Sequence, residues 1–125
     1  MPRSSITNVL FVCSQNRLRS PTAEQVFASR RDLEVSSAGT NNDAENPLTA
    51  ELVTWADVIM VMEKTHRTKV QERFRKVLNG KRIICLDIPD DYAFMDTALI
   101  ALLKTRLARH FPTRDDGDDR VATGA

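Results

Sequence analysis

The stretch from Val9 to Pro21 constrains the fold more than any other part of the chain, because a buried strand, a tight loop and a helix start follow one another directly. Four consecutive apolar residues, Val9 to Val12, are typical of a strand covered on both faces. Pro21 lies where the first turn of a helix tolerates proline. Between them, Cys13 and Arg19 are separated by five residues. The spacing places a thiol at the end of a strand and a guanidinium at the start of a helix.

Such a loop has a specific chemistry. Where a chain closes from a strand onto a helix N-terminus, successive backbone N–H groups turn inward and form a nest for an anion, reinforced by the helix dipole. These amides and the neighbouring guanidinium favour the thiolate form of Cys13, while the planar fork of Arg19 can bind two oxygens of a tetrahedral dianion. Ser20 is either the helix N-cap or a hydroxyl donor to the Cys13 sulfur. We therefore predict attack of a thiolate on phosphorus, with a phospho-cysteine intermediate.

The residues of this loop resemble the phosphate loop of the low-molecular-weight protein tyrosine phosphatases, whose pattern is Cys-x-x-Asn-x-x-Arg-Ser-Pro near the N-terminus. Asn16 stands at the matching asparagine, a residue type that tolerates left-handed backbone. Val35 to Thr40 is similar to the second strand of that family and its exit, and Ala56 to Met62 followed by His66-Arg67 is similar to the third strand and the next helix. The resemblance implies a single three-layer α/β domain with a four-stranded parallel sheet in the order 2-1-3-4.

The resemblance also implies roles for the loop residues. Cys13 is the predicted nucleophile and Arg19 holds the phosphoryl group. The other residues predicted to bind substrate are Ser14, Gln15, Asn16, Arg17, Leu18 and Ser20. The implied substrate is a phosphorylated protein (phosphotyrosine) or a small phosphomonoester, with inorganic phosphate as product and no cofactor.

A second chemical element, Asp87-Ile88-Pro89-Asp90-Asp91-Tyr92, follows the predicted fourth strand. Sites in open parallel sheets form beyond the carboxyl ends of the strands, so this segment should face the Cys13 loop. A carboxylic acid is needed there to protonate the leaving oxygen. The related phosphatases carry an Asp-Pro-aromatic motif at this point, from which this sequence departs. Counting from the strand makes Asp87 the acid, while aligning on the proline shifts the role to Asp90 or Asp91; we favour Asp87, with Asp90 next.

The whole chain alternates strand-like and helix-like segments, which predicts a parallel sheet with helices on both faces. Trp55 is predicted to be a core residue and His66 a surface or helix-start residue. Strands are expected at residues 9–12, 33–38, 58–62 and 82–86, and helices at 21–30, after Asn46-Pro47, at 63–78 up to Asn79-Gly80, and from Asp96 to about His110. The predicted domain spans residues 7–112, between a flexible start (1–6) and an acidic, disordered tail (113–125).

Composition limits the remaining possibilities. With 125 residues, 42% of them hydrophobic, and a net charge of +1, the chain can form one domain with a substantial core and has no overall bias toward nucleic acid or membranes. Two cysteines and no apolar leader favour a reducing, cytoplasmic location. The two histidines and two cysteines lack ligand-like spacing, so we predict no metal site.

Two other functions on the same loop stay open. A thiol redox enzyme of the arsenate-reductase type would need a resolving cysteine, for which Cys85 is the candidate. A phosphoryl carrier or anion-binding module would not need an arginine and an acid.

The sequence departs from the family pattern at two further places. The family's frequent second loop cysteine is Leu18 here, and Asn41-Asn42-Asp43 offers no clear match to the aromatic wall of the family. The phosphate-handling half of the predicted site therefore looks intact, whereas the half that recognises tyrosine does not.

Overall fold

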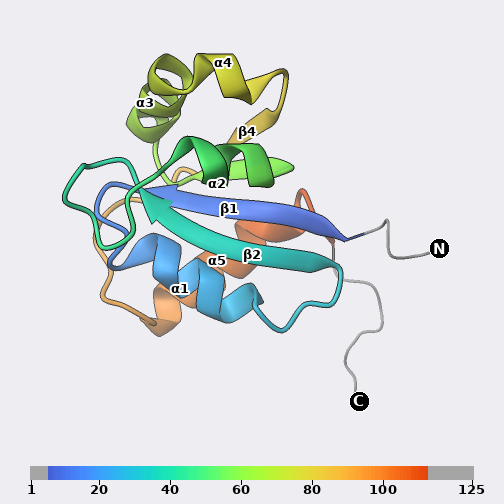
Figure 1. Ribbon diagram of the computed structural model, residues 1–125. Coiled ribbons are helices and arrows are strands. Elements are labelled where there is room, and N and C mark those ends of the chain that lie inside the picture. Colours follow the sequence, from blue (N-terminus) through green and yellow to red (C-terminus); the bar gives the residue numbers. More distant parts are fainter. Residues whose placement is uncertain (1–5, 113–125) are drawn as a thin grey trace.

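A parallel sheet of four strands forms the centre of the molecule (Figure 1). The computed structural model describes residues 6–112; the predicted acidic tail, and the predicted flexible start except Ile6, lie outside the described residues. The strands are β1 (Thr7–Cys13), β2 (Leu33–Gly39), β3 (Val58–Val61) and β4 (Arg82–Cys85). They lie in the order β2-β1-β3-β4 and all pairs are parallel, which confirms the predicted topology.

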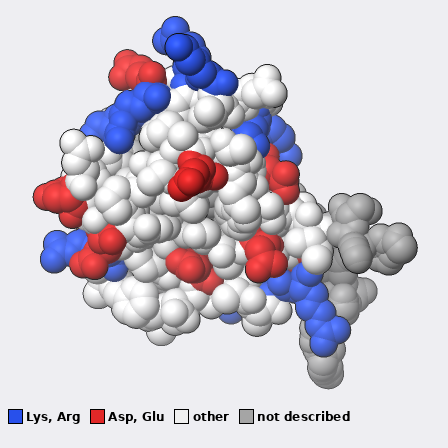
Figure 2. All heavy atoms as spheres, viewed as in Figure 1, with Lys and Arg blue, Asp and Glu red and all other residues white. Residues whose placement is uncertain are grey.

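Helices cover both faces of this sheet, as predicted. They are α1 (Arg19–Phe27), α2 (Ala50–Trp55), α3 (Lys64–Arg73), α4 (Arg75–Leu78) and α5 (Thr97–Ala108). Figure 1 shows α1 and α5 on one side of the sheet and α2, α3 and α4 on the other. In Figure 2, which has the same viewpoint, basic side chains gather at the top, over α3 and α4, and acidic side chains are spread across the middle of the face.

Each face of β1 contributes to a separate apolar core, because side chains alternate between the faces of a strand. Val9, Phe11 and Cys13 pack with α1 and α5 residues such as Phe27 and Leu103. Leu10 and Val12 pack in the second core, which includes Ala38, Val53, Ile59, Val61 and Val70. All five apolar residues from Val9 to Cys13 are 0–3% exposed. The strand that carries the predicted nucleophile is therefore fixed from both sides.

Two predicted helices differ from the observed ones. The helix expected after Asn46-Pro47 begins only at Ala50, where Thr49 is the N-cap and accepts a hydrogen bond from the Leu52 N–H. The Asn46 side chain instead donates to the carbonyl of Ser37, so it ties the chain to β2 and is not free to cap a helix.

The helix expected over residues 63–78 is divided at Phe74, whose dihedral angles (φ −121°, ψ 24°) are not helical. The break redirects the chain so that Phe74, Val77 and Leu78 all pack against the second core. Asn79 (φ 44°) and Gly80 (φ 80°) end the second piece in left-handed backbone, as predicted. Trp55 packs against the same core, which confirms its predicted role.

Candidate active site

The sulfur of Cys13 lies at the carboxyl end of β1, where the chain leaves the sheet and turns into α1. Cys13 is only 3% exposed, and its Sγ lies 3.0 Å from the Oγ of Ser20 in the first turn of α1. The contact brings together the two residues that the sequence placed seven positions apart. It decides between the two predicted uses of Ser20, because the helix has no side-chain cap and the hydroxyl faces the sulfur.

Asn16 fixes the direction of the Ser20 hydroxyl. Its backbone has the predicted left-handed conformation (φ 58°), and its Nδ2 donates to Ser20 Oγ at 3.0 Å and to Ser37 Oγ at 2.9 Å. Since Ser20 Oγ already accepts from Asn16, its own hydrogen is available for another acceptor. The Cys13 sulfur at 3.0 Å is nearer than the carbonyl of Ala38 at 3.5 Å. The arrangement can therefore stabilise a thiolate.

The segment after β2 holds the phosphate loop, residues 13–19, in place through its backbone. The N–H groups of Thr40, Asn41 and Glu45 each donate at 2.9 Å, to the carbonyls of Cys13, Ser14 and Gln15 in that order. Gly39 is necessary for this approach, because a Cβ there would lie 2.6 Å from Ser14 O. Only glycine allows the two segments to pack this closely.

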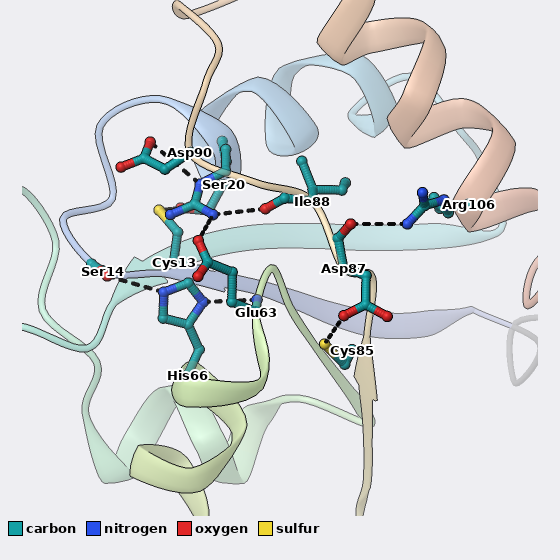
Figure 3. Close-up of polar contacts among 11 residues, drawn as sticks. Cys13, Ser14, Ser20, Glu63, His66, Cys85, Asp87, Ile88, Asp90 and Arg106 are labelled. Atoms are coloured by element: carbon teal, nitrogen blue, oxygen red, sulfur yellow. Dashed lines mark hydrogen bonds and ion pairs between the residues drawn. The ribbon is translucent and has the colours of Figure 1, made fainter.

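Arg19 is nearly buried, at 3% exposed, and is held from two other connections of the sheet. Its Nη1 donates to the carbonyl of Ile88 at 2.7 Å and pairs with the carboxylate of Glu63, which follows β3 (Figure 3). Its Nε lies 3.7 Å from Oδ1 of Asp90. The guanidinium is thereby oriented at the end of the sheet where the phosphate loop begins.

His66 is a site residue that the sequence did not reveal. It was expected at the surface or a helix start; it does lie in the first turn of α3, but it is 2% exposed. Its Nδ1 accepts from the Glu63 N–H at 3.0 Å, so the hydrogen of the neutral ring is on Nε2, which lies 3.0 Å from Ser14 Oγ. The signal in the sequence was the spacing Glu63-x-x-His66, which matches a capping box.

Burial is the main cause that lowers the pKa of His66 to about 4, and the positive charge of Arg19 contributes to the same shift. His66 is therefore neutral at neutral pH and serves as a fixed hydrogen-bond donor to the phosphate loop. It links the start of α3 to the loop without adding charge near the guanidinium.

The two candidate acids point in different directions (Figure 3). Asp87 has left-handed backbone (φ 55°), and its carboxylate accepts from the thiol of Cys85 at 3.4 Å, on the far side of Ile88 from Cys13. The largely exposed carboxylate of Asp90 lies 3.7 Å from Arg19 Nε, and Figure 3 shows it on the same side of Ile88 as Cys13 and Ser20. The geometry favours Asp90, the second choice from the sequence, over Asp87. Asp91 is exposed, and its carboxylate has no ion pair among residues 6–112.

The remaining predicted residues of the loop lie at its rim. Ser14 and Gln15 are half-buried, whereas Arg17 and Leu18 are exposed. Arg17 forms a loose ion pair with Glu45 at 3.8 Å. Within the part of the chain that the structure describes, no cluster of three histidine, cysteine or carboxylate side chains could hold a metal ion.

Cys85 is poorly placed to react with Cys13. It ends β4, and β3 lies between β4 and β1. Two inter-strand spacings amount to about 10 Å, whereas the Cα atoms of a disulfide are at most about 7 Å apart. Burial raises the pKa of the Cys85 thiol, which makes it a poorer nucleophile. The geometry therefore does not favour the arsenate-reductase alternative.

Comparison with known proteins finds a similarity to one family in the N-terminal part of the chain. Residues 8–54 match the family model described as low molecular weight phosphotyrosine protein phosphatase. A comparison with curated proteins found no significant match. The match bears out the predicted resemblance over these residues, and the predicted enzyme class, a hydrolase of the phosphatase type, is the class that this family model describes.

Solved structures share the fold over most of the chain. The YwlE arginine phosphatase from Geobacillus stearothermophilus is similar with a TM-score of 0.67 and 23% identity, over 84% of this chain and 92% of that one. The tyrosine phosphatase Wzb from Escherichia coli K30, in complex with phosphate, gives a TM-score of 0.67 and 20% identity over 83% and 95%. SP-PTP from Streptococcus pyogenes gives 0.68 and 18% over 84% and 93%. The predicted fold class is confirmed. None of the helices within residues 6–112 is long and apolar enough to span a bilayer.

Proposed function

We propose that this chain, which has the phosphate loop and the fold of the low molecular weight phosphotyrosine protein phosphatases, hydrolyses phosphomonoesters through a phospho-cysteine intermediate. The observation that carries the proposal is the 3.0 Å contact between Cys13 Sγ and Ser20 Oγ, at the N-terminus of α1 and beside the buried Arg19. A thiolate stabilised by a hydroxyl, facing a guanidinium and a helix N-terminus, suits attack on a phosphoryl dianion.

In the first step, the Cys13 thiolate attacks phosphorus and the ester P–O bond breaks as the S–P bond forms. The inward N–H groups of the loop and Arg19 bind the equatorial oxygens, whose charge they stabilise in the transition state. We assign the protonation of the leaving oxygen to the carboxylic acid of Asp90, which lies on the same side of Ile88 as Cys13. The products of this step are the alcohol and the phospho-cysteine.

In the second step, water attacks the phospho-cysteine. Asp90, now a carboxylate, takes a proton from the water as the new P–O bond forms and the S–P bond breaks. Inorganic phosphate and the Cys13 thiolate are released. The Ser20 hydroxyl, which Asn16 directs toward the sulfur, stabilises the thiolate as a leaving group.

The proposed substrates are a phosphotyrosine protein or a small phosphomonoester. The similar solved structures include both tyrosine phosphatases and an arginine phosphatase, so the fold by itself does not select the phosphorylated group. A cytoplasmic location is part of the proposal, because Cys13 and Cys85 are both free thiols and such thiols persist in a reducing compartment.

Hydrolysis of a small aryl phosphate across pH tests the proposal. We expect Cys13→Ser to lower turnover by at least about 10⁴-fold and Arg19→Ala by about 10²- to 10³-fold. Cys85→Ser is the matched control, because it removes the other thiol of the chain, and it should stay within about twofold of the wild type. A well-folded wild type that binds phosphate but does not hydrolyse the ester would contradict the proposal and favour a carrier or binding module. Thiol-dependent reduction of arsenate by the wild type that is lost in Cys85→Ser would favour the redox alternative.

A further inference from the structure

A groove of about 560 Å³ lies between the segment that follows β2 and one side of α3. Its lining consists of Thr40, Asn41, Asn42, Asp43, Lys69 and Arg73. We call these six residues the lateral groove. Their side chains take no part in the hydrolysis proposed above.

The lateral groove begins beside the phosphate loop. Thr40 and Asn41 donate their N–H groups to the carbonyls of Cys13 and Ser14, so their backbone runs one inter-strand spacing, about 4.8 Å, from that of the loop. On α3, Lys69 lies three residues after His66, which contacts Ser14, and Arg73 lies four residues further. Residues at these spacings share one helix face. That face therefore leads from the phosphate loop into the groove.

The groove is suited to an anion. Two cations, Lys69 and Arg73, face a single carboxylate, Asp43. Among the described residues no ion pair engages Lys69 or Arg73 within 4.0 Å. The Nη1 of Arg73 donates to the carbonyl of Thr40, and its guanidinium lies 5.3 Å from the centre of the Phe74 ring, so its orientation is fixed while other N–H donors stay available.

Thr40 adds a hydroxyl without a partner to the residues that line the groove. The residue is 3% exposed, yet its hydroxyl has no hydrogen-bond partner within residues 6–112. A buried hydroxyl without a partner costs free energy, and a ligand that bonds to it removes the cost. Carboxylates and phosphates accept hydrogen bonds from hydroxyls, ammonium groups and guanidinium groups alike.

We propose that the lateral groove binds a second anionic group, a carboxylate or phosphate, carried by the same substrate whose phosphoryl group enters the phosphate loop. The inference rests on the proposed phosphatase function and narrows its substrates. An acidic residue near a phosphorylated side chain, or the second phosphate of a small bisphosphate ester, presents this group. In this proposal the positive charges of Lys69 and Arg73 select the substrate, in place of the aromatic wall for which the sequence has no clear match.

Matched substrates test the proposal. The two pairs are a phosphotyrosine peptide with aspartate or with asparagine beside the phosphotyrosine, and an aryl bisphosphate or its monophosphate. For the wild type we expect a kcat/KM about threefold to tenfold higher for the more acidic member of a pair, through a lower KM and weakening with salt. A gain confined to the peptides, or to the bisphosphate, identifies the source of the anion and supports the proposal in either case.

Two variants sharpen this test. Lys69→Gln should remove most of the preference while leaving hydrolysis of a simple aryl phosphate unchanged, and Lys69→Glu should reverse the preference toward a peptide with lysine beside the phosphotyrosine. Lys76→Gln is the control, because it removes the same charge from α4 outside the lateral groove.

Equal kcat/KM for acidic and neutral substrates in the wild type, or equal losses in Lys69→Gln and Lys76→Gln, would overturn the inference. Hydrolysis of the simple aryl phosphate would then leave the proposed function standing. Failure to hydrolyse any of the substrates would overturn the proposed function, and the inference with it.

Discussion

The phosphate loop and the loop that carries the candidate acids lie at the same end of the sheet but are built in opposite ways. The key side chains of the phosphate loop are 0–6% exposed and bond to one another, to β2 or to the segments that follow β3 and β4; they are Cys13, Asn16, Arg19 and Ser20. In the segment from Asp87 to Asp96, hereafter the acid loop, most side chains are exposed, including Asp87, Asp90 and Phe94.

The acid loop is held mainly by its backbone. Ile88 is its fully buried anchor, and Arg106 of α5 donates to the carbonyls of Leu86 and Asp87. Asp87 (φ 55°) and Met95 (φ 60°) both have left-handed backbone, a conformation that aspartate tolerates and that is costly for methionine. We infer that the anion site is rigid before substrate arrives, whereas the position of the acid depends on a few backbone contacts.

The largest expected effect separates the two candidate acids. Asp90→Asn should lower kcat/KM about 10²- to 10⁴-fold on a phenyl phosphate, which needs protonation of its leaving group in the first step, and much less on a nitrophenyl phosphate. Asp87→Asn is the matched control and should stay within about threefold, because its carboxylate faces Cys85. The reverse outcome, with Asp87→Asn as the damaging change, would show that the acid loop rearranges when substrate binds.

Asn16 tests the rigidity of the phosphate loop. Asn16→Ala should lower the free energy of unfolding by about 2–4 kcal/mol, because two buried hydrogen bonds are lost and alanine resists the left-handed backbone. Asn16→Gly also loses the bonds but allows the backbone, and should recover about 1 kcal/mol. Urea unfolding measures both. Equal stability of the alanine variant and the wild type would contradict a rigid, hydrogen-bonded loop.

Arg106 tests the backbone support of the acid loop. Arg106→Gln removes the donors to two carbonyls and should lower kcat/KM on phenyl phosphate about tenfold, because kcat/KM reports the step in which Asp90 protonates the leaving group. Because Arg106 acts by positioning Asp90, the loss should be smaller on nitrophenyl phosphate, whose leaving group needs no acid. An equal loss on both esters would indicate general destabilisation and not a displaced acid.

The smallest effect concerns His66 and pH. Because the folded pKa of about 4 lies below the ordinary 6.5, the unfolded chain binds the proton more readily between these values. Wild-type stability should therefore fall as the pH falls from 6.5 toward 4, and His66→Gln should lack this part of the loss. Between pH 6.5 and 4, the unfolding free energy of the wild type should therefore fall by more than that of His66→Gln. A constant difference would show that His66 titrates normally.

The same contrast explains how much the sequence could predict. The phosphate loop was predictable because its signals are local: Cys13, Asn16 and Arg19 stand at fixed spacings after an apolar strand. The alternation of strand-like and helix-like segments is also a local signal, and it predicted the parallel sheet. The direction of Asp87 was not predictable, since its left-handed backbone accompanies the tertiary contact with Arg106. His66 looked like a solvated helix residue because its partner, Ser14, lies 52 positions away in the sequence.

The most direct test of the central claim is to trap the covalent intermediate. Asp90→Asn should be mixed with nitrophenyl phosphate, quenched in acid and digested, and the peptide that contains Cys13 weighed by mass spectrometry. The nitrophenolate leaves without an acid, but hydrolysis of the intermediate needs the Asp90 carboxylate as base, so the phospho-cysteine should accumulate. We expect the mass of one phosphoryl group on that peptide, absent in the double variant Cys13→Ala, Asp90→Asn, because alanine cannot be phosphorylated. Nitrophenol release with no phosphoryl group on Cys13 in the quenched enzyme would contradict the proposed mechanism.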